Sequence, residues 1–240
     1  MQAVGNDIVD LQEALAAKKS QDQRFLNRVF TSTEQDLIFD SEQSEITLWL
    51  FWAAKETIYK LVSQLESPPV FSHKKFIVSF SNSELSVRYE NYNFALSYKI
   101  TQDYIHVLCG PDAVARMQVA RMQRSGIRED SSRIPASPDS ASLHPGYIKN
   151  FSQQERESIQ SAASLAVRYD LKQYLAKKLN LPYSSIEIIR NAIRGKSQPP
   201  YLLLNQQKCS IGVSLSHHGR YYAWVLSNSC LLNSEGIKAS

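Results

Sequence analysis

The sequence predicts an α+β protein that is a pseudo-dimer of two similar subdomains, each with helices packed on an antiparallel sheet. In each half of the 240 residues, segments of helical periodicity precede short β-branched and aromatic runs. Short segments of the two halves can be aligned about 115 residues apart, as in a duplicated fold. A polar stretch rich in Ser, Pro, Asp and Arg separates them. We therefore expect an N-terminal half over 1–110, a linker over 111–145 and a C-terminal half over 146–240.

The N-terminal half begins with a predicted strand over 3–11, in which Gly5 permits a close backbone approach. Helical periodicity follows over 12–29, and Thr31 with Glu34 forms a capping box that starts another helix. The central helix is expected over 46–64, before the Pro-Pro pair that ends it. Four strand-like runs then predict an antiparallel meander, over 75–80, 85–89, 94–100 and 104–108.

The stretch after this meander changes composition. A helix is possible over 113–122, but 124–145 has almost no large apolar residues and reads as an exposed linker. In the C-terminal half we expect one helix that starts over 151–155 and a long helix over 161–179. The remaining strand-like runs are 186–189, 201–204, 211–215 and 221–226.

Two segment pairs carry the proposed internal repeat. The strand segment 94–104 is aligned with 211–221, and the helix segment 52–60 is aligned with 165–173. The N-terminal copy holds Asp7, Glu56 and Lys60, whereas the C-terminal copy holds Ser216 and His217. Because each copy keeps a different polar set, we expect one complete site across the interface between the halves.

Composition and charge exclude several classes of protein. The net charge of +4 is mild, and no dense Lys/Arg stripe is interleaved with aromatic residues, so a nucleic-acid role is not expected. The longest apolar run, 46–54, is shorter than the roughly 18 residues of a membrane span, and 1–20 lacks a signal-peptide pattern. Three widely spaced cysteines fit free thiols in a reducing compartment. We expect a cytoplasmic protein without a membrane partner.

Acidic residues near the N-terminus and on the central helix are the first candidates for chemistry. Glu56 and Lys60 lie four apart and share one helix face, which by itself is typical of an exposed ion pair worth about 0.3–0.5 kcal/mol. Asp7 and Asp10 stand between β-branched residues, an awkward place for charge. From the residues alone, Asp7 is either a turn-forming aspartate or a ligand.

Several motifs together resemble the signature of the 4′-phosphopantetheinyl transferases. They are Gly-Asn-Asp-Ile-Val-Asp at 5–10, Phe-Thr-x-x-Glu at 30–34, Trp-Ala-Ala-Lys-Glu-x-x-x-Lys at 52–60, Gly-Lys at 195–196 and Ser-Leu-Ser-His at 214–217. Gly-x-Asp followed by the Lys-Glu-x-x-x-Lys motif is specific, whereas Gly-Lys or Ser-His alone is weak. The resemblance covers both halves but not the linker, and it implies the fold of that family.

The resemblance departs from the fused, two-copy members in the order of its halves. Those members carry Ser-His in the N-terminal half, and here the order is reversed. After Asp7 comes Ile-Val-Asp, as in the single-domain members, and Ser197 stands where the family has proline.

The resemblance implies an enzyme that transfers 4′-phosphopantetheine from coenzyme A to a serine of an apo acyl or peptidyl carrier protein and releases 3′,5′-ADP. Asp7 and Glu56 would hold Mg²⁺, and Glu56 would accept the serine proton. Lys60 would neutralise or protonate the leaving phosphate. One complete site per fused chain implies a monomer.

The same resemblance implies the coenzyme A contacts. Ser216 and His217 would hold its phosphates, with Lys196 and Arg168 adding charge and Lys55 as a further phosphate candidate. Two alternatives remain open: a catalytically inactive relative that binds coenzyme A or a carrier protein, and an interaction scaffold with an ordinary ion-paired helix.

Overall fold

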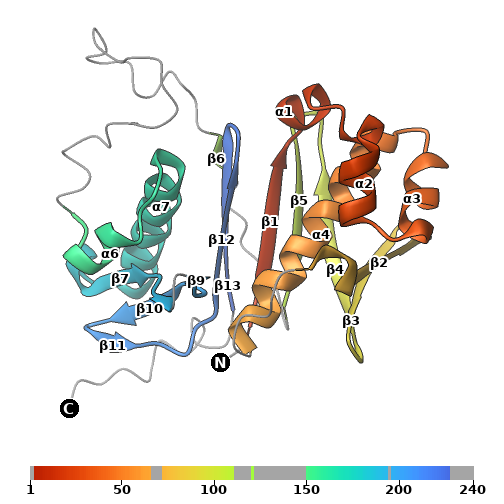
Figure 1. The fold of residues 1–240 in the computed structure, drawn as a ribbon. Coiled ribbons are helices and arrows are strands. Elements are labelled where there is room, and N and C mark those ends of the chain that lie inside the picture. Colours follow the sequence, from red (N-terminus) through yellow and green to blue (C-terminus); the bar gives the residue numbers. More distant parts are fainter. Residues whose placement is uncertain (1–2, 66–71, 111–119, 122–149, 194–195, 228–240) are drawn as a thin grey trace, which may run out of the picture.

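The computed structural model describes residues 3–65, 72–110, 120–121, 150–193 and 196–227. It is an α+β structure whose N-terminal and C-terminal halves lie side by side, with strand β1 of one half next to strand β12 of the other (Figure 1). No helix in these ranges combines the length and the apolar character needed to cross a lipid bilayer.

The N-terminal half has one five-stranded antiparallel sheet in the order β1-β5-β4-β3-β2. The predicted meander is confirmed, with strand β1 added at its β5 edge. The strands are β1 (Gly5–Asp10), β2 (Phe76–Ser81), β3 (Glu84–Tyr89), β4 (Tyr92–Ile100) and β5 (Tyr104–Cys109).

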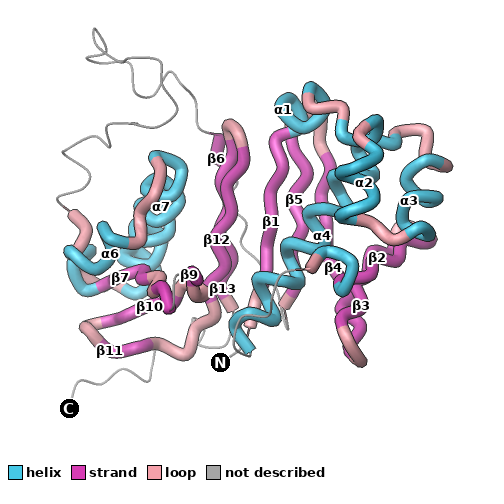
Figure 2. The backbone as a smooth tube through the Cα atoms, in the orientation of Figure 1, coloured by secondary structure: helices cyan, strands magenta, loops and turns pink. Residues whose placement is uncertain are grey.

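Helices cover one face of this sheet (Figure 2). They are α1 (Leu11–Ala16), α2 (Gln23–Val29), α3 (Ser32–Phe39) and α4 (Ser44–Leu65), with 3₁₀ turns η1 (Lys19–Gln21) and η2 (His73–Lys75). Helix α4 lies along β1 and β5 because its apolar stripe, Phe51, Ala54, Ile58 and Leu61, is buried in the core. Burial of one large side chain of this stripe stabilises the fold by about 1.5–3 kcal/mol.

The C-terminal half is built from smaller sheets under a long helix. Its three-stranded sheets have the orders β11-β10-β7 and β12-β13-β6, and β8 pairs with β9. The elements are β6 (Ala120–Arg121), α6 (Gln153–Glu157), α7 (Ala162–Leu179), η4 (Tyr183–Ser185), β7 (Ile186–Ile189), β8 (Ala192–Ile193), β9 (Lys196–Ser197), β10 (Tyr201–Leu204), β11 (Gln207–Lys208), β12 (Val213–His218) and β13 (Tyr221–Leu226).

One short strand lies within the predicted linker. Strand β6 lies inside the expected linker 111–145 and at the end of the possible helix over 113–122, yet it pairs antiparallel with β13. It extends the β13 edge as β1 extends the β5 edge of the other half. Of the remaining linker, 111–119 and 122–145 lie outside the described residues.

Strand pairing confirms the repeat in the two halves. Ser97 pairs with Leu108 between β4 and β5, and Ser214 pairs with Val225 between β12 and β13. Each residue of the second pair lies 117 positions after its counterpart in the first. This is the displacement of the predicted strand alignment.

Two matching buried ion pairs show that the predicted helix alignment was wrong by one helical turn. Thr31 and Ser152 each cap a helix in a capping box, with Glu34 and Glu155 as the partner acids. These acids form buried ion pairs with lysines of α4 and α7, at 2.7 and 2.8 Å (Lys55–Glu34 and Lys172–Glu155).

The two pairs have the same further contact. Glu34 also accepts the backbone N–H of Val78 in β2, and Glu155 accepts that of Ile188 in β7. The counterpart of Lys55 is therefore Lys172, not Arg168. Sequence comparison missed this alignment of α4 with α7 because the residues that fix it, the acids and the lysines of the ion pairs, lie far apart in sequence.

The interface between the halves is lined by apolar side chains from both of the sheets that meet there. Val4 packs with Leu108 and Val225, and Ile8 packs with Ala223. These contacts hold β1, which carries Asp7, against the sheet that carries His217.

Candidate functional site

A carboxylate and an ammonium group from different elements meet beside the interface. Asp7 lies on β1 and Lys60 on α4, and their side chains form an ion pair of 2.7 Å between Lys60 Nζ and Asp7 Oδ1. Lys60 Nζ also donates to the carbonyl oxygen of Asn6 at 3.1 Å. Strand and helix approach this closely because position 5 is glycine: a Cβ there would overlap the carbonyl oxygen of Thr57.

Glu56 stands beside this pair. Burial, and next the negative charge of Asp7, raise the pKa of Glu56 to about 7, while the charge of Lys60 opposes the shift. Two carboxyl groups that repel each other are a suitable place for a cation, because a divalent ion would remove the repulsion. The predicted pair of Asp7 and Glu56 is thus brought together by the fold.

The donor set fits Mg²⁺ held partly by other ligands. Mg²⁺ prefers one or two carboxylates, with phosphate oxygens and waters completing its shell. The described ranges contain no cluster of three or more His, Cys, Asp or Glu side chains that could hold a metal alone. Asp7 and Glu56 would supply the two protein oxygens, and a bound phosphate would supply others.

Beneath the acidic pair lies a buried polar contact. The side-chain amide nitrogen of Asn6 is 3.3 Å from Nε2 of His106, and both residues are fully buried. Burial, and next the charge of Lys60, lower the pKa of His106 to about 4, so its ring is neutral at physiological pH. A neutral ring adds no positive charge beside Lys60.

The C-terminal half contributes an imidazole to the same place. His217 on β12 keeps access to solvent. The surrounding protein lowers its pKa by desolvation, and the charges of Lys60, Arg168 and Arg190 lower it further, while Asp7 opposes them. Lys60 and Asp7 therefore lie near His217 although they belong to the other half.

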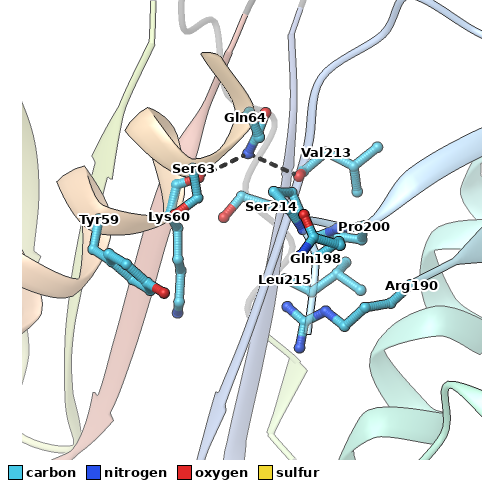
Figure 3. Close-up of a pocket in the computed structure, with 11 residues that line it drawn as sticks. Tyr59, Lys60, Ser63, Gln64, Arg190, Gln198, Pro200, Val213, Ser214 and Leu215 are labelled. Atoms are coloured by element: carbon cyan, nitrogen blue, oxygen red, sulfur yellow. Dashed lines mark hydrogen bonds between the residues drawn. The ribbon is translucent and has the colours of Figure 1, made fainter. Parts of the chain in front are cut away.

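A cavity of about 230 Å³ lies between α4 and β12 (Figure 3). Lys60 and Arg190 point toward it from opposite halves (Figure 3). Its walls are Tyr59, Lys60, Ser63, Gln64, Arg190, Gln198, Pro199, Pro200, Val213, Ser214 and Leu215. Two cationic side chains at one small cavity make it suitable for an anionic group.

Arg190 is a site residue that sequence reasoning missed. It directly follows β7, and its Nε is buried without a hydrogen-bond partner in the described part of the chain. Burial lowers its pKa, against the opposing effect of Tyr59. A buried guanidinium nitrogen with an unused donor favours an anionic ligand. An arginine placed directly after an apolar strand was the available signal.

The expectation that Lys55 binds phosphate is wrong. Its side chain is fully buried, and Nζ bonds both carboxylate oxygens of Glu34 and the carbonyl oxygens of His73 and Phe76. With these acceptors around it, the ammonium has no room for a phosphate. Lys55 fixes the core of the N-terminal half instead.

Arg168 and Ser216 also lie away from the cavity. Arg168 is 3% exposed and donates to the carbonyl oxygens of Ser164 and Ser158 and to the Ser164 hydroxyl, while its Nε is buried without a partner in the described part of the chain. Ser216 is 3% exposed. Strand alternation directs it to the same side as Ser214, which faces Asn6 of β1. The hydroxyl oxygen of Ser216 is buried without a hydrogen-bond partner in the described part of the chain, so ligand contact by Arg168 or Ser216 stays a prediction. The side chain of Lys196 lies outside the described part of the structure.

The chain was compared with known proteins. A family model described as the 4′-phosphopantetheinyl transferase superfamily matches residues 3–109. A holo-[acyl-carrier-protein] synthase of Protochlamydia amoebophila (strain UWE25) is 40% identical over 57 residues, which are 24% of this chain and 47% of that protein. The matched stretch thus spans about half the length of that relative.

Solved structures were also found to be similar. The holo-[acyl-carrier-protein] synthase of Neisseria meningitidis aligns with a TM-score of 0.38 and 18% identity, over 45% of this chain and 97% of that one. An ACPS-CoA complex of Chronobacterium ammoniagenes aligns with a TM-score of 0.38 and 22% identity, over 45% and 95%.

Proposed function

Since residues 3–109 belong to the 4′-phosphopantetheinyl transferase superfamily, we propose that this chain transfers 4′-phosphopantetheine from coenzyme A to a carrier protein. The acceptor is a serine hydroxyl of an apo acyl or peptidyl carrier protein, the reaction needs Mg²⁺, and 3′,5′-ADP is released. The observation that carries this proposal is that two kinds of groups lie near one another at the interface between the halves, where Lys60 and Arg190 line one cavity. Asp7, Glu56 and Lys60 come from the N-terminal half, and His217 and Arg190 come from the C-terminal half.

The transfer moves one phosphorus atom between two oxygens. The serine oxygen bonds to the phosphorus that carries pantetheine, and the bond from that phosphorus to the bridging pyrophosphate oxygen breaks. Glu56 takes the serine proton, directly or through a water, because its raised pKa makes it a base near neutral pH. A cation held by Asp7 and Glu56 would neutralise the charge of the pyrophosphate.

The leaving group is bound by two cationic side chains, Lys60 and Arg190, and by the imidazole of His217. Lys60 stands beside Asp7 and can neutralise the phosphate oxygen that is released. Arg190 and His217 hold the remaining phosphates of 3′,5′-ADP from the other side of the interface. Neither half contains both sets, so both are needed for turnover.

Mass spectrometry of apo carrier proteins incubated with the purified chain, coenzyme A and Mg²⁺ tests this proposal. We expect at least one carrier to gain the mass of a single phosphopantetheine. Glu56→Gln should lower the rate by about 100-fold or more while coenzyme A still binds. Asp7→Ala should also fail, and modestly higher Mg²⁺ should not rescue it.

Glu42→Gln is the matched control, because Glu42 is exposed near the start of α4 and lies far from Lys60 in sequence. It should transfer at the wild-type rate. Near-normal turnover by Glu56→Gln would remove Glu56 from the role of base. Coenzyme A binding by wild type without transfer to any acyl or peptidyl carrier would favour the non-catalytic alternative.

A further inference from the structure

Strands β1 and β12 are joined along their length by side chains. The backbone N–H of Asn6 donates to the hydroxyl oxygen of Ser214 at 3.0 Å, and that of Asp10 donates to Nδ1 of His218 at 3.0 Å. Both bonds join residues 208 positions apart, so the two strands run parallel in one fixed register. We call this contact the β1–β12 seam.

Gln64 of α4 closes the seam at the end where β1 begins. Its amide nitrogen donates to the carbonyl oxygen of Val4 at 2.6 Å and to that of Val213 at 3.1 Å. Its carbonyl oxygen accepts the backbone N–H of Val4 at 3.3 Å. One side chain therefore holds the backbones of both halves.

Asp10 and Arg220 close the other end. Oδ2 of Asp10 accepts two hydrogen bonds from Arg220, from the backbone N–H at 2.9 Å and from the side-chain Nε–H at 2.8 Å. Oδ1 of Asp10 accepts a third, from Nη2 of Arg220 at 2.8 Å. Oδ1 also accepts the backbone N–H of Gln12 at the start of α1. Gly219 has a φ of +53°, and a Cβ there would stand 2.5 Å from Oδ2. The turn before Arg220 is therefore shaped around this carboxylate.

The seam encloses the two residues on which the proposed function depends. Asp7 lies between Asn6 and Asp10 on β1, and His217 lies between Ser214 and His218 on β12. Any slip of the seam would change the distance between the carboxylate that would hold the cation and the imidazole that would hold phosphate. A misplacement of about 1 Å can cost about 100-fold in rate.

We propose that Asp10 and Arg220 are positioning residues, which set the register of β1 against β12 and thereby align Asp7 with His217. This inference rests on the proposed transfer reaction. Asp10 is not a metal ligand, although it follows Asp7 in an acidic motif. It is fully buried, and four N–H groups of Arg220 and Gln12 point at its two oxygens.

The test compares Asp10→Asn, Arg220→Gln and the double variant in the full chain. Each single variant should lower kcat/KM by about 10–100-fold, with a raised KM for coenzyme A. The double variant should be no worse than the single variants, because each substitution removes the same interaction between Asp10 and Arg220. Arg220→Lys, which keeps the charge but not the forked geometry, should lose less. The Mg²⁺ concentration for half-maximal rate should stay unchanged.

Asp103→Asn is the matched control. Asp103 lies 4.0 Å from the same guanidinium but is 52% exposed, so its loss should leave the kinetics unchanged. Three results would overturn the proposal. One is a shifted Mg²⁺ requirement in Asp10→Asn alone, which would make Asp10 a ligand. Another is a double variant as slow as the product of the two single effects. The third is wild-type KM and kcat in the folded variants with only a lower Tm, which would mean a purely structural role.

The backbone amides give a readout that does not depend on turnover. In Asp10→Asn and Arg220→Gln, hydrogen exchange at the amides of Asn6 and Asp10 should speed up relative to wild type. Unchanged exchange at these amides would refute the positioning role of Asp10 and Arg220 even if the protein proves to be no transferase. Absence of transfer by wild type, with faster exchange in the variants, would refute the proposed function but would still support the role of Asp10 and Arg220 in setting the strand register.

Discussion

Two aspartates three positions apart in β1 have opposite surroundings. Burial raises the pKa of Asp10, but hydrogen bonds from Arg220 and Gln12 and the charge of Arg220 outweigh it, and the pKa falls to about 2. Among the described residues Asp7 forms an ion pair with Lys60, and it lies beside the acid Glu56. The carboxylate of Asp10, which accepts four N–H groups, is suited to structure, and that of Asp7, which lies beside a second acid, is suited to a cation.

The raised pKa of Glu56 predicts a stability gain when the acid is removed. A group whose pKa rises from 4.5 in the unfolded chain to about 7 in the fold contributes stability below pH 4.5 that is lost as the pH rises through 7. Glu56→Gln should therefore be more stable than wild type at pH 8, by about 1–3 kcal/mol without metal. Thermal unfolding at pH 4 and pH 8 measures this, and an equal gain at both values would contradict it.

The same group predicts how the rate depends on pH. Glu56 must lose its proton both to act as a base and to bind a cation, so the transfer rate should rise as the pH increases toward 7. Higher Mg²⁺ should move this rise to lower pH, because the cation competes with the proton. A rise at the same pH for every Mg²⁺ concentration would argue against cation binding by Glu56.

At the scale of elements, α4 performs three tasks at once. Its apolar stripe fills the core, its middle carries Lys55, Glu56 and Lys60, and Gln64 near its end holds the seam. Residues adjacent in sequence therefore have different environments. Lys55 faces the core and pairs with Glu34, whereas Glu56, one position on, faces the interface beside Asp7.

The matching buried ion pairs predict matching losses of stability. Lys55→Met and Lys172→Met each leave a buried carboxylate without its partner, so each should cost about 3–5 kcal/mol of unfolding free energy. Replacing the acid too, as in Lys55→Met with Glu34→Leu, should recover much of the loss. Denaturant unfolding measures these values. A near-neutral Lys172→Met would show that the two pairs are not equivalent in energy.

At the scale of the whole molecule, the two copies are alike in architecture and unlike in polar groups. With the corrected alignment, Gln173 takes the place of Glu56, and Ile100 takes the place of His217. The symmetry-related counterpart of the proposed site therefore lacks both the acid of Glu56 and the imidazole of His217. The proposed site is therefore the one where β1 meets β12.

This asymmetry predicts one coenzyme A per chain and no need for a second chain. Because the site takes residues from both halves of one chain, a monomer of about 27.2 kDa is sufficient. Light scattering should give this mass, and calorimetry should give a stoichiometry near one. Activity that falls on dilution together with loss of a dimer would contradict this prediction.

The sequence by itself determined the α+β class and the longer elements, such as α4, α7 and the strands of the meander, but not the short strands β6, β8, β9 and β11. The capping box at Thr31 and Glu34, the apolar stripe of α4 and the β-branched runs are local patterns, and local patterns record local structure. The motifs also identified Asp7, Glu56, Lys60 and His217 as candidates, and the fold brings these four together.

The tertiary structure alone decided which charged side chains face a ligand and which face each other. Lys55 looked like a phosphate ligand but is enclosed by acceptors of its own half, and Arg190 attracted no notice although it points into the cavity. Asp10 acquired its partner from 210 positions away. A sequence pattern records the periodicity of neighbours, whereas burial and pairing depend on residues that only the folded chain brings together.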